Sequence, residues 1–294
     1  MPAPRALVAA LLLSGVALAA TGAPPGGPQV GPPPASLGLD PFYAKHLDAG
    51  GIPVVSSARV DDATLQIARE LVDGMLAERP DLRRAMVADG VRVGVMAIDE
   101  STTDLPEQRH WKKPAPDDPR LTPCERKHYD RIAAMSDREY WDSRARGMGG
   151  RYTTGAEENL RGVPDTRYFG ENILLHELAH AVLYAVQRSD PALYRRVEEA
   201  YGRAMDAGLW QGDYAAVTIQ EYWAEGTQFW FNSNKLSRGE DREVLSADDL
   251  RAYDPALYAV LGEVYSARQR LDADAYYRHP ARSRVPARAA GSEC

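Results

Sequence analysis

The sequence predicts an α+β fold in which a small mixed sheet precedes a helical C-terminal half. Two short apolar segments suited to strands stand at residues 52–55 and 91–98. From about residue 170 onward, apolar residues recur every three or four positions, which is the period of an amphipathic helix. Strand patterns followed by a run of helical patterns are typical of α+β domains.

The N-terminal half supplies one helix and one strand that we expect inside the sheet. Asp61 or Asp62 can cap a helix that ends at Pro80, because proline lacks the backbone N–H needed to continue it. The segment 91–98 has few polar interruptions, which indicates a central strand. Residues 99–130 are rich in proline and charge and predict a long surface loop, either over a functional site or as a passive insertion.

Four helices are expected in the C-terminal half. Pro191 suits the first position of the second of them, and Gly208 follows its end. The fourth begins after Ser246 and is expected to continue past Pro255. Apolar periodicity and capping residues place the four helices at about residues 170–187, 191–207, 217–232 and 247–269.

The N-terminal end carries the pattern of an export signal. Arg5 precedes an apolar run that reaches Ala20 and ends in small residues suited to a signal peptidase. We therefore expect residues 1–20 to be a signal peptide and the protein to be secreted; the alternative is a buried N-terminal helix. No second long apolar stretch follows, so we expect no stable membrane insertion after cleavage.

Three further segments complete the predicted organisation of the chain. Residues 21–36 are rich in proline and glycine and predict a semi-extended linker. Residues 37–280 are expected to form a single domain, followed by a flexible tail at 281–294. Export would permit a disulfide between Cys124 and Cys294, although an unpaired or intermolecular thiol fits equally well.

Length and charge limit the class of partner. At 294 residues the chain can hold one large domain with extra segments. Its net charge of −7 and pI near 5.5 argue against nucleic acid or an anionic membrane surface, because both require a basic protein surface. Charge alone does not identify a substrate.

The strongest functional signal is the sequence HELAH at residues 176–180, set inside an apolar run. One helical turn separates His176 from His180, so both imidazoles lie on one face and can reach one metal ion. Glu177 projects beside that position, where a general base must lie to take a proton from water. The motif therefore predicts zinc-assisted hydrolysis, with a chance match as the alternative.

A third metal ligand is expected downstream, because two histidines rarely hold catalytic zinc alone. The only later histidine is His279, so a carboxylate is needed. Glu221 and Glu225 share one face of an aromatic-rich helix, where two like charges require a cation or hydrogen-bond donors. One can bind the metal while the other accepts the free ring N–H of a ligand histidine, or both can face water. Glu199 is the competing ligand, in a segment typical of a solvated helix face.

The glycine-rich segment at residues 147–154 stands upstream of the motif helix. In metal-dependent proteases of this general plan, an edge strand in this order along the chain pairs with an extended substrate. An ordinary glycine-rich loop is the alternative interpretation.

The sequence EYWAE at residues 221–225 resembles the E-aromatic-aromatic-A-E segment of the anthrax-lethal-factor-like metallopeptidases, which include the pro-pro endopeptidases. In that family the first glutamate ligates zinc, and a tyrosine seven positions earlier stabilises the oxyanion. Tyr214 stands seven positions before Glu221. The resemblance covers about residues 170–231, and the sequence departs from the family at 99–130 and directly after Glu225.

The resemblance implies a zincin-like catalytic domain of the gluzincin type that holds one Zn²⁺ per chain and cleaves a protein or peptide substrate. The activity expected is that of a secreted zinc-dependent endopeptidase. A zinc-dependent hydrolase of cell-wall crosslinks and an inactive metal-bearing binding domain are the alternatives. The roles that the resemblance implies are zinc ligation by His176, His180 and Glu221, general-base catalysis by Glu177, oxyanion stabilisation by Tyr214, and support of a ligand histidine by Glu225.

Overall fold

The computed structural model describes residues 29–119, 121 and 123–284. The predicted signal peptide, residues 21–28 of the predicted linker and residues 285–294 of the predicted tail lie outside the described residues, as does the pairing of Cys124 with Cys294. Within the described part of the chain, no helix is both long and apolar enough to cross a membrane.

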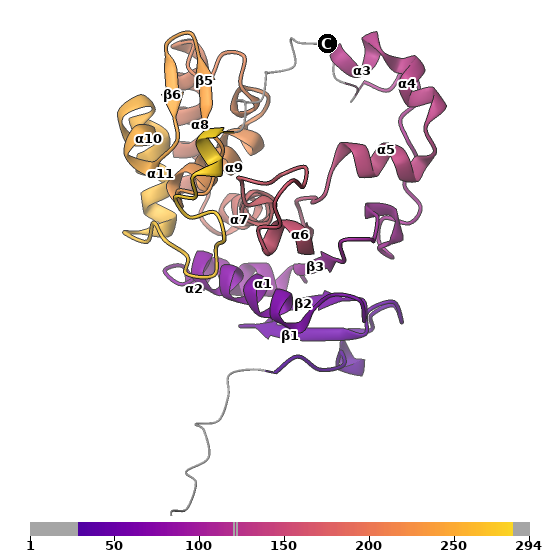
Figure 1. The fold of residues 1–294 in the computed structure, drawn as a ribbon. Helices are drawn as coiled ribbons and strands as arrows, with labels where there is room; N and C mark the ends of the chain where they lie inside the picture. The colour runs from indigo at the N-terminus through magenta and orange to yellow at the C-terminus, as the bar shows by residue number, and fades with distance from the viewer. Residues whose placement is uncertain (1–28, 120, 122, 285–294) are drawn as a thin grey trace, which may run out of the picture.

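A four-stranded mixed sheet with the order β1-β2-β3-β4 forms one side of the molecule (Figure 1). β1 (Lys45–Ala49) pairs antiparallel with β2 (Ile52–Ser56) through a turn at Gly50 and Gly51, whose positive φ angles of 60° and 93° suit a two-residue hairpin. β3 (Arg92–Met96) is parallel to both neighbours, β2 and β4 (Tyr152–Ala156). The small mixed sheet and the central position of the 91–98 strand are confirmed.

Two helices lie between this sheet and the helical half of the molecule (Figure 1). α1 (Asp62–Met75) begins where the Asp61 side chain accepts the N–H of Ala63, and its apolar face is buried. The first helix ends at Met75, before the predicted end next to Pro80, and Pro80 instead begins α2 (Pro80–Ala88). α2 packs on the long helix α7 (Ile173–Ser189), which connects the two halves into one core.

The helical C-terminal half is confirmed, with one correction. α7, α8 (Pro191–Asp206) and α9 (Ile219–Trp230) lie within a few residues of the predicted bounds. The fourth predicted helix is two helices, α10 (Ala247–Tyr253) and α11 (Pro255–Tyr265). Proline has no N–H to continue α10, and the Asp254 side chain accepts the N–H of Leu257 to start α11 instead.

The predicted loop at 99–130 and the residues that follow it up to Arg144 contain regular structure. A capping box at Ser101 and Asp104 closes the 3-10 turn η2, and a second one at Ser136 and Glu139 starts α5. These elements form an arm with a small separate hydrophobic cluster of Leu121, Ile132 and Tyr140 (Figure 1). The arm comprises the described residues between 102 and 144, with the elements η2 (Thr102–Asp104), α3 (Pro123–Lys127), α4 (Tyr129–Ala134) and α5 (Asp137–Arg144).

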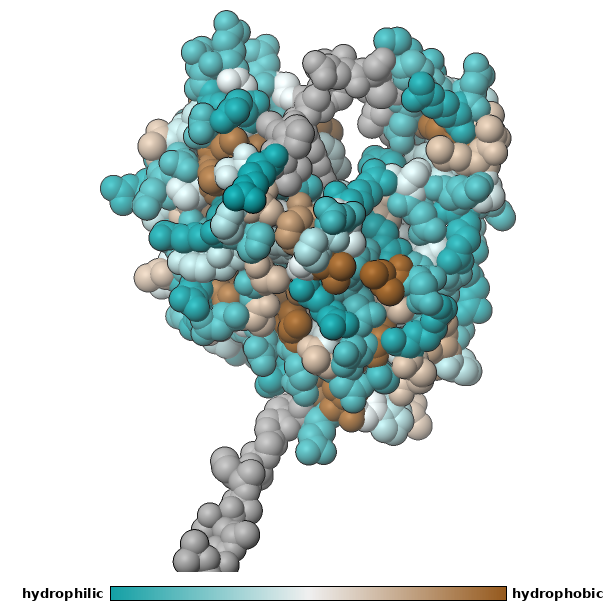
Figure 2. Space-filling model, in the orientation of Figure 1, coloured by the Kyte–Doolittle hydropathy of each residue, from teal (hydrophilic) through white to brown (hydrophobic). Residues whose placement is uncertain are grey.

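The remaining elements are short. Gly31, in the predicted linker, exchanges two backbone hydrogen bonds with His46 of β1. The other short elements are η1 (Ala35–Leu37), α6 (Glu157–Leu160), η3 (Tyr214–Ala216), the hairpin of β5 (Ser237–Gly239) and β6 (Arg242–Val244), and α12 (Ala281–Arg284). The face of the molecule shown in Figure 2 is mostly hydrophilic, with a few small hydrophobic patches.

Candidate metal centre

The candidate site lies where α7 packs against α9. The Asn172 side chain accepts the N–H of Leu175 and starts α7, which places the HELAH residues in its second and third turns. The Thr218 hydroxyl accepts the N–H of Glu221 and starts α9. Glu221 therefore lies in the first turn of α9, where the positive end of the helix dipole favours a carboxylate.

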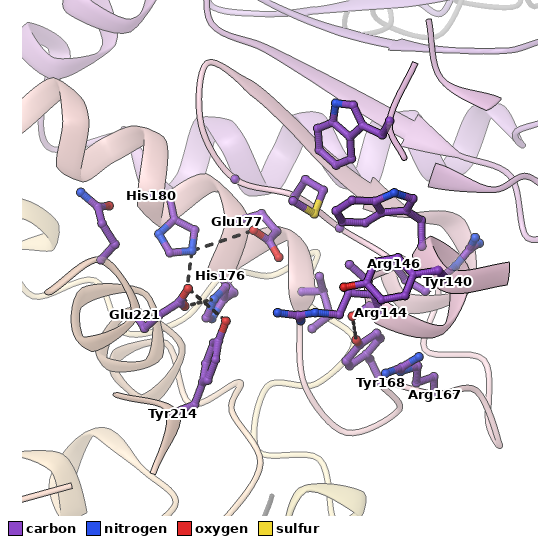
Figure 3. Close-up of a pocket in the computed structure, with 18 of the residues that line it drawn as sticks. Tyr140, Arg144, Arg146, Arg167, Tyr168, His176, Glu177, His180, Tyr214 and Glu221 are labelled. Atoms are coloured by element: carbon purple, nitrogen blue, oxygen red, sulfur yellow. Dashed lines mark hydrogen bonds and ion pairs between the residues drawn. The ribbon is translucent and has the colours of Figure 1, made fainter. Parts of the chain in front are cut away.

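The structure brings together His176, His180 and Glu221 (Figure 3). One ligand atom from each residue lies within 4.8 Å of the others, so this group could hold a metal ion. Glu221 Oε2 is 3.0 Å from His176 Nε2 and 3.6 Å from His180 Nε2. A tetrahedral zinc site with bonds of about 2.1 Å separates two ligand atoms by about 3.4 Å, and these spacings fit that requirement.

The second ring nitrogen of His176 has a partner that the sequence did not reveal. Nδ1 lies 3.0 Å from Gln228 Oε1, and Gln228 Nε2 donates to the backbone oxygen of Asn172 at 2.9 Å. Because the amide N–H₂ of Gln228 is directed to a carbonyl, its oxygen must accept from Nδ1. This arrangement directs Nε2 of His176 toward Glu221 and the metal position.

Glu225, the predicted support of a ligand histidine, lies next to this contact. Its Oε1 is 3.6 Å from His176 Nδ1, and its Oε2 accepts a hydrogen bond of 2.7 Å from Asn234. Glu221, Glu225 and Gln228 follow one another at spacings of four and three residues, which places them on one face of α9. That spacing is the signal by which Gln228 could have been found.

The three carboxylates around His176 control the protonation of the site. Burial alone would lower the pKa of His176. The hydrogen bond with Glu221 and the charges of Glu177, Glu225 and Glu221 have the larger effect and raise this pKa to about 10. Burial and the charge on His176 lower the pKa of His180 to about 4. A metal ion at Nε2 of His176 therefore replaces a proton, so metal binding should release protons.

Glu177 and Tyr214 flank the three candidate ligands without being part of the group. Glu177 Oε2 is 3.9 Å from His180 Nε2, and the carboxylate faces the cavity (Figure 3). The Tyr214 hydroxyl donates to Glu221 Oε1 at 3.1 Å, and its ring stacks on that of His176. Burial and the charge of Glu221 raise the pKa of Tyr214, so the hydroxyl keeps its proton and remains a donor.

Glu199, the competing ligand, lies away from the group. Its side chain is 64% exposed on α8 and sits 3.7 Å from Arg203 Nη1. The group of three candidate ligands found among the described residues does not include it.

A cavity of about 820 Å³ opens beside the candidate ligands. His176, Glu177 and Glu221 line one side of it, and Tyr140 and Arg144 of the arm line the other (Figure 3). Trp111, Lys112 and Pro114 of the predicted loop also line the cavity. The segment that was predicted as a surface loop thus supplies part of the wall of the candidate site.

The glycine-rich segment borders the cavity along the edge of the sheet. Met148 forms an antiparallel bridge with Thr154 of β4, so the segment takes the outer position next to that strand. A Cβ atom at Gly149 would lie 2.4 Å from His180 Cδ2, and one at Gly147 would lie 3.0 Å from Glu177 Cγ. Glycine at these two positions lets the backbone approach both site side chains closely.

Replacing Gly149 by alanine should weaken metal binding. The added methyl group overlaps the ring of His180, which has to move from its place opposite Glu221. We expect zinc affinity to fall about 10- to 100-fold, as when the support of a metal ligand is removed. Zinc titration of the purified protein measures this, with Gly202→Ala on α8 as control, since a Cβ there meets no atom within 4 Å. Unchanged affinity in Gly149→Ala would contradict the close packing.

Comparison with known proteins finds structural similarity but no matching sequence. No family model and no curated protein sequence matches the chain. Among solved structures, the chain is similar to the pro-pro endopeptidase PPEP-2 from Paenibacillus alvei, at 15% sequence identity and a TM-score of 0.44. The similarity covers 72% of this chain and 96% of that one.

Proposed function

We propose that this protein is a secreted zinc-dependent endopeptidase that hydrolyses peptide bonds. The observation that carries the proposal is the gathering of His176, His180 and Glu221 within 4.8 Å beside the carboxylate of Glu177. Two imidazoles and one carboxylate are a ligand set of catalytic zinc sites, which leaves a coordination position open. Export is inferred from the sequence pattern of residues 1–20.

The residues of the site divide the proposed chemistry between them. When bound, zinc would act as a Lewis acid and lower the pKa of a water molecule bound to it towards about 7. Glu177 accepts the proton of the attacking water and later delivers it to the leaving amine. Tyr214 donates its O–H to the oxygen on which negative charge develops. Its hydroxyl donates to Glu221 in the structure, so it has to turn from Glu221 to the substrate.

The cavity supports an extended peptide as the substrate. It is bordered by the 147–149 segment at the edge of the sheet, whose backbone can pair with an extended chain. The carboxylate of Glu177 supports an enzyme rather than a binding domain, since a domain that only binds has no use for a base beside the metal.

Hydrolysis of unstructured substrates tests the proposal. The chain without residues 1–20 is incubated with a library of quenched fluorescent peptides and, separately, with cell-wall fragments. We expect cleavage of internal peptide bonds that a chelator stops and added zinc restores. If only cell-wall crosslinks are cleaved, the protein is a zinc-dependent hydrolase of those crosslinks and not an endopeptidase. No zinc-dependent cleavage of either substrate would overturn the proposed activity.

A further inference from the structure

The walls of the cavity are cationic, although the chain as a whole carries a net charge of −7. The two carboxylates that line it, Glu177 and Glu221, belong to the candidate metal centre and its base. A divalent cation would offset the charge of both. The cationic residues lining the cavity are Lys112, Arg144, Arg146, Arg167 and Lys235.

Lys112 Nζ lies 3.0 Å from Asp137 Oδ2, and two further cations are neutralised by buried partners. Arg146 Nε lies 2.8 Å from Glu158 Oε1, and Lys235 Nζ lies 2.8 Å from Glu171 Oε1. The carboxylates of both pairs are buried behind the wall, so these cations are held in the structure of the protein rather than offered to a ligand.

Arg144 is placed differently. It is the last residue of α5, and its side chain points into the cavity toward Tyr214 (Figure 3). Its Nε is 3.2 Å from Glu125 Oε1, yet its side chain remains 41% exposed. Burial lowers the pKa of Arg144, but the charge of Glu125 raises it above its usual value, so the guanidinium stays charged. A planar guanidinium can bind a second carboxylate through its remaining N–H groups.

Arg167 extends the same wall. Its guanidinium lies over the ring of Tyr168, 5.2 Å from the ring centroid, and its Nη1 donates to the backbone oxygen of Asp142 at 3.4 Å. The Tyr168 hydroxyl donates to the backbone oxygen of Arg144 at 3.3 Å. This hydrogen bond connects the segment of Arg167 to the segment of Arg144. Figure 3 shows both on the side of the cavity opposite the candidate ligands.

We propose that Arg144, with Arg167 further out, binds a carboxylate of the peptide substrate close to the scissile bond. The carboxylate belongs either to an aspartate or glutamate side chain, which agrees with an endopeptidase, or to a free C-terminus, which has the same chemistry but would mean removal of C-terminal residues. That the bound peptide is a substrate rests on the proposed peptidase function. That the bound group is a carboxylate rests on the two arginines of the cavity wall. Arginine is suited to this contact because its two parallel N–H groups match the two oxygens of a carboxylate.

Peptide binding to the Glu177→Gln protein tests this inference without turnover. Fluorescence anisotropy compares peptides that differ only in having Glu, Gln or Lys at single positions, each with a free or an amidated C-terminus. We expect the acidic peptide to bind about 10- to 100-fold more tightly than its Gln counterpart, the range of a charge-assisted hydrogen bond. A preference that persists after amidation assigns the site to a side chain, and one lost on amidation assigns it to the C-terminus.

Variants in the same background identify the residue responsible. Arg144→Met should remove most of the preference, Arg144→Lys should retain part of it, and Arg167→Met should reduce it. Arg203→Met is the matched control, because Arg203 forms a similar ion pair with Glu199 but does not line the cavity. Circular dichroism checks that each variant folds. If Arg144→Met does not fold, the binding preference of Arg167→Met serves as the test.

Two results would overturn the inference. One is equal binding of the acidic and neutral peptides. The other is an acidic preference that survives Arg144→Met and Arg167→Met but disappears with a chelator, since the carboxylate would then bind the metal. Failure of the peptidase proposal looks different: the wild type cleaves nothing, while the Arg144-dependent preference for acidic peptides remains.

Discussion

Glu177→Gln should abolish peptide hydrolysis while the protein keeps its zinc. Glutamine has nearly the same shape as glutamate but cannot accept the proton of the attacking water. General-base catalysis contributes about 10²- to 10⁴-fold, so we expect kcat to fall by about 10³-fold or more with little change in KM. Since Glu177 is outside the group of three candidate ligands, metal content should stay near that of the wild type.

The measurement combines turnover of a quenched peptide with zinc content by atomic emission on the same preparation. Glu199→Gln serves as the control, because that carboxylate lies exposed on α8 and should affect neither quantity. Full activity in Glu177→Gln would exclude the carboxylate as the base, and loss of zinc together with activity would make it a ligand instead.

Glu221→Ala should remove the metal altogether. This carboxylate supplies the negative charge of the ligand group and lies within 3.6 Å of a ring nitrogen of each histidine. Loss of a ligand costs more than loss of its support, so we expect zinc affinity to fall by well over about 100-fold. His176→Ala should have the same effect.

Zinc content after dialysis, measured side by side in Glu221→Ala, Glu225→Ala and Glu199→Ala, separates the three glutamates. Glu225→Ala should keep most of its zinc, because Gln228 also holds the Nδ1 side of His176. Loss of zinc in Glu225→Ala with retention in Glu221→Ala would exchange the roles of the two residues. A wild type that never holds zinc would remove the basis of the peptidase proposal.

The helical half could be predicted from the sequence because its information is local. Apolar spacing and capping residues place α7, α8 and α9 within a few residues, since a helix forms its hydrogen bonds within one segment. β1 was missed because it depends on pairing with β2 across the Gly50-Gly51 turn, and its own sequence KHLDA has little strand character. The break at Asp254 was missed because apolar periodicity continues across the proline.

The residues of the candidate site that share one turn of a helix could be predicted from the sequence. Those that are brought together from separate segments could not. His176, Glu177 and His180 are identified by spacing alone. Gln228 depends on how closely α9 approaches α7, and Arg144 depends on how the arm folds over the cavity. Both facts concern long-range packing, for which the sequence has no short motif.

Asn172 connects the start of α7 to the candidate ligand His176. Its side chain accepts the N–H of Leu175, its amide donates to Asp274, and its backbone oxygen accepts from Gln228. Fraying of the first turn of α7 would therefore release Gln228 and let the imidazole of His176 rotate. If zinc binds here, opening of this turn and loss of the ion become linked, so amide hydrogen exchange at Leu175 and His176, whose N–H groups bond to Asn172, should slow when zinc binds and quicken when it leaves.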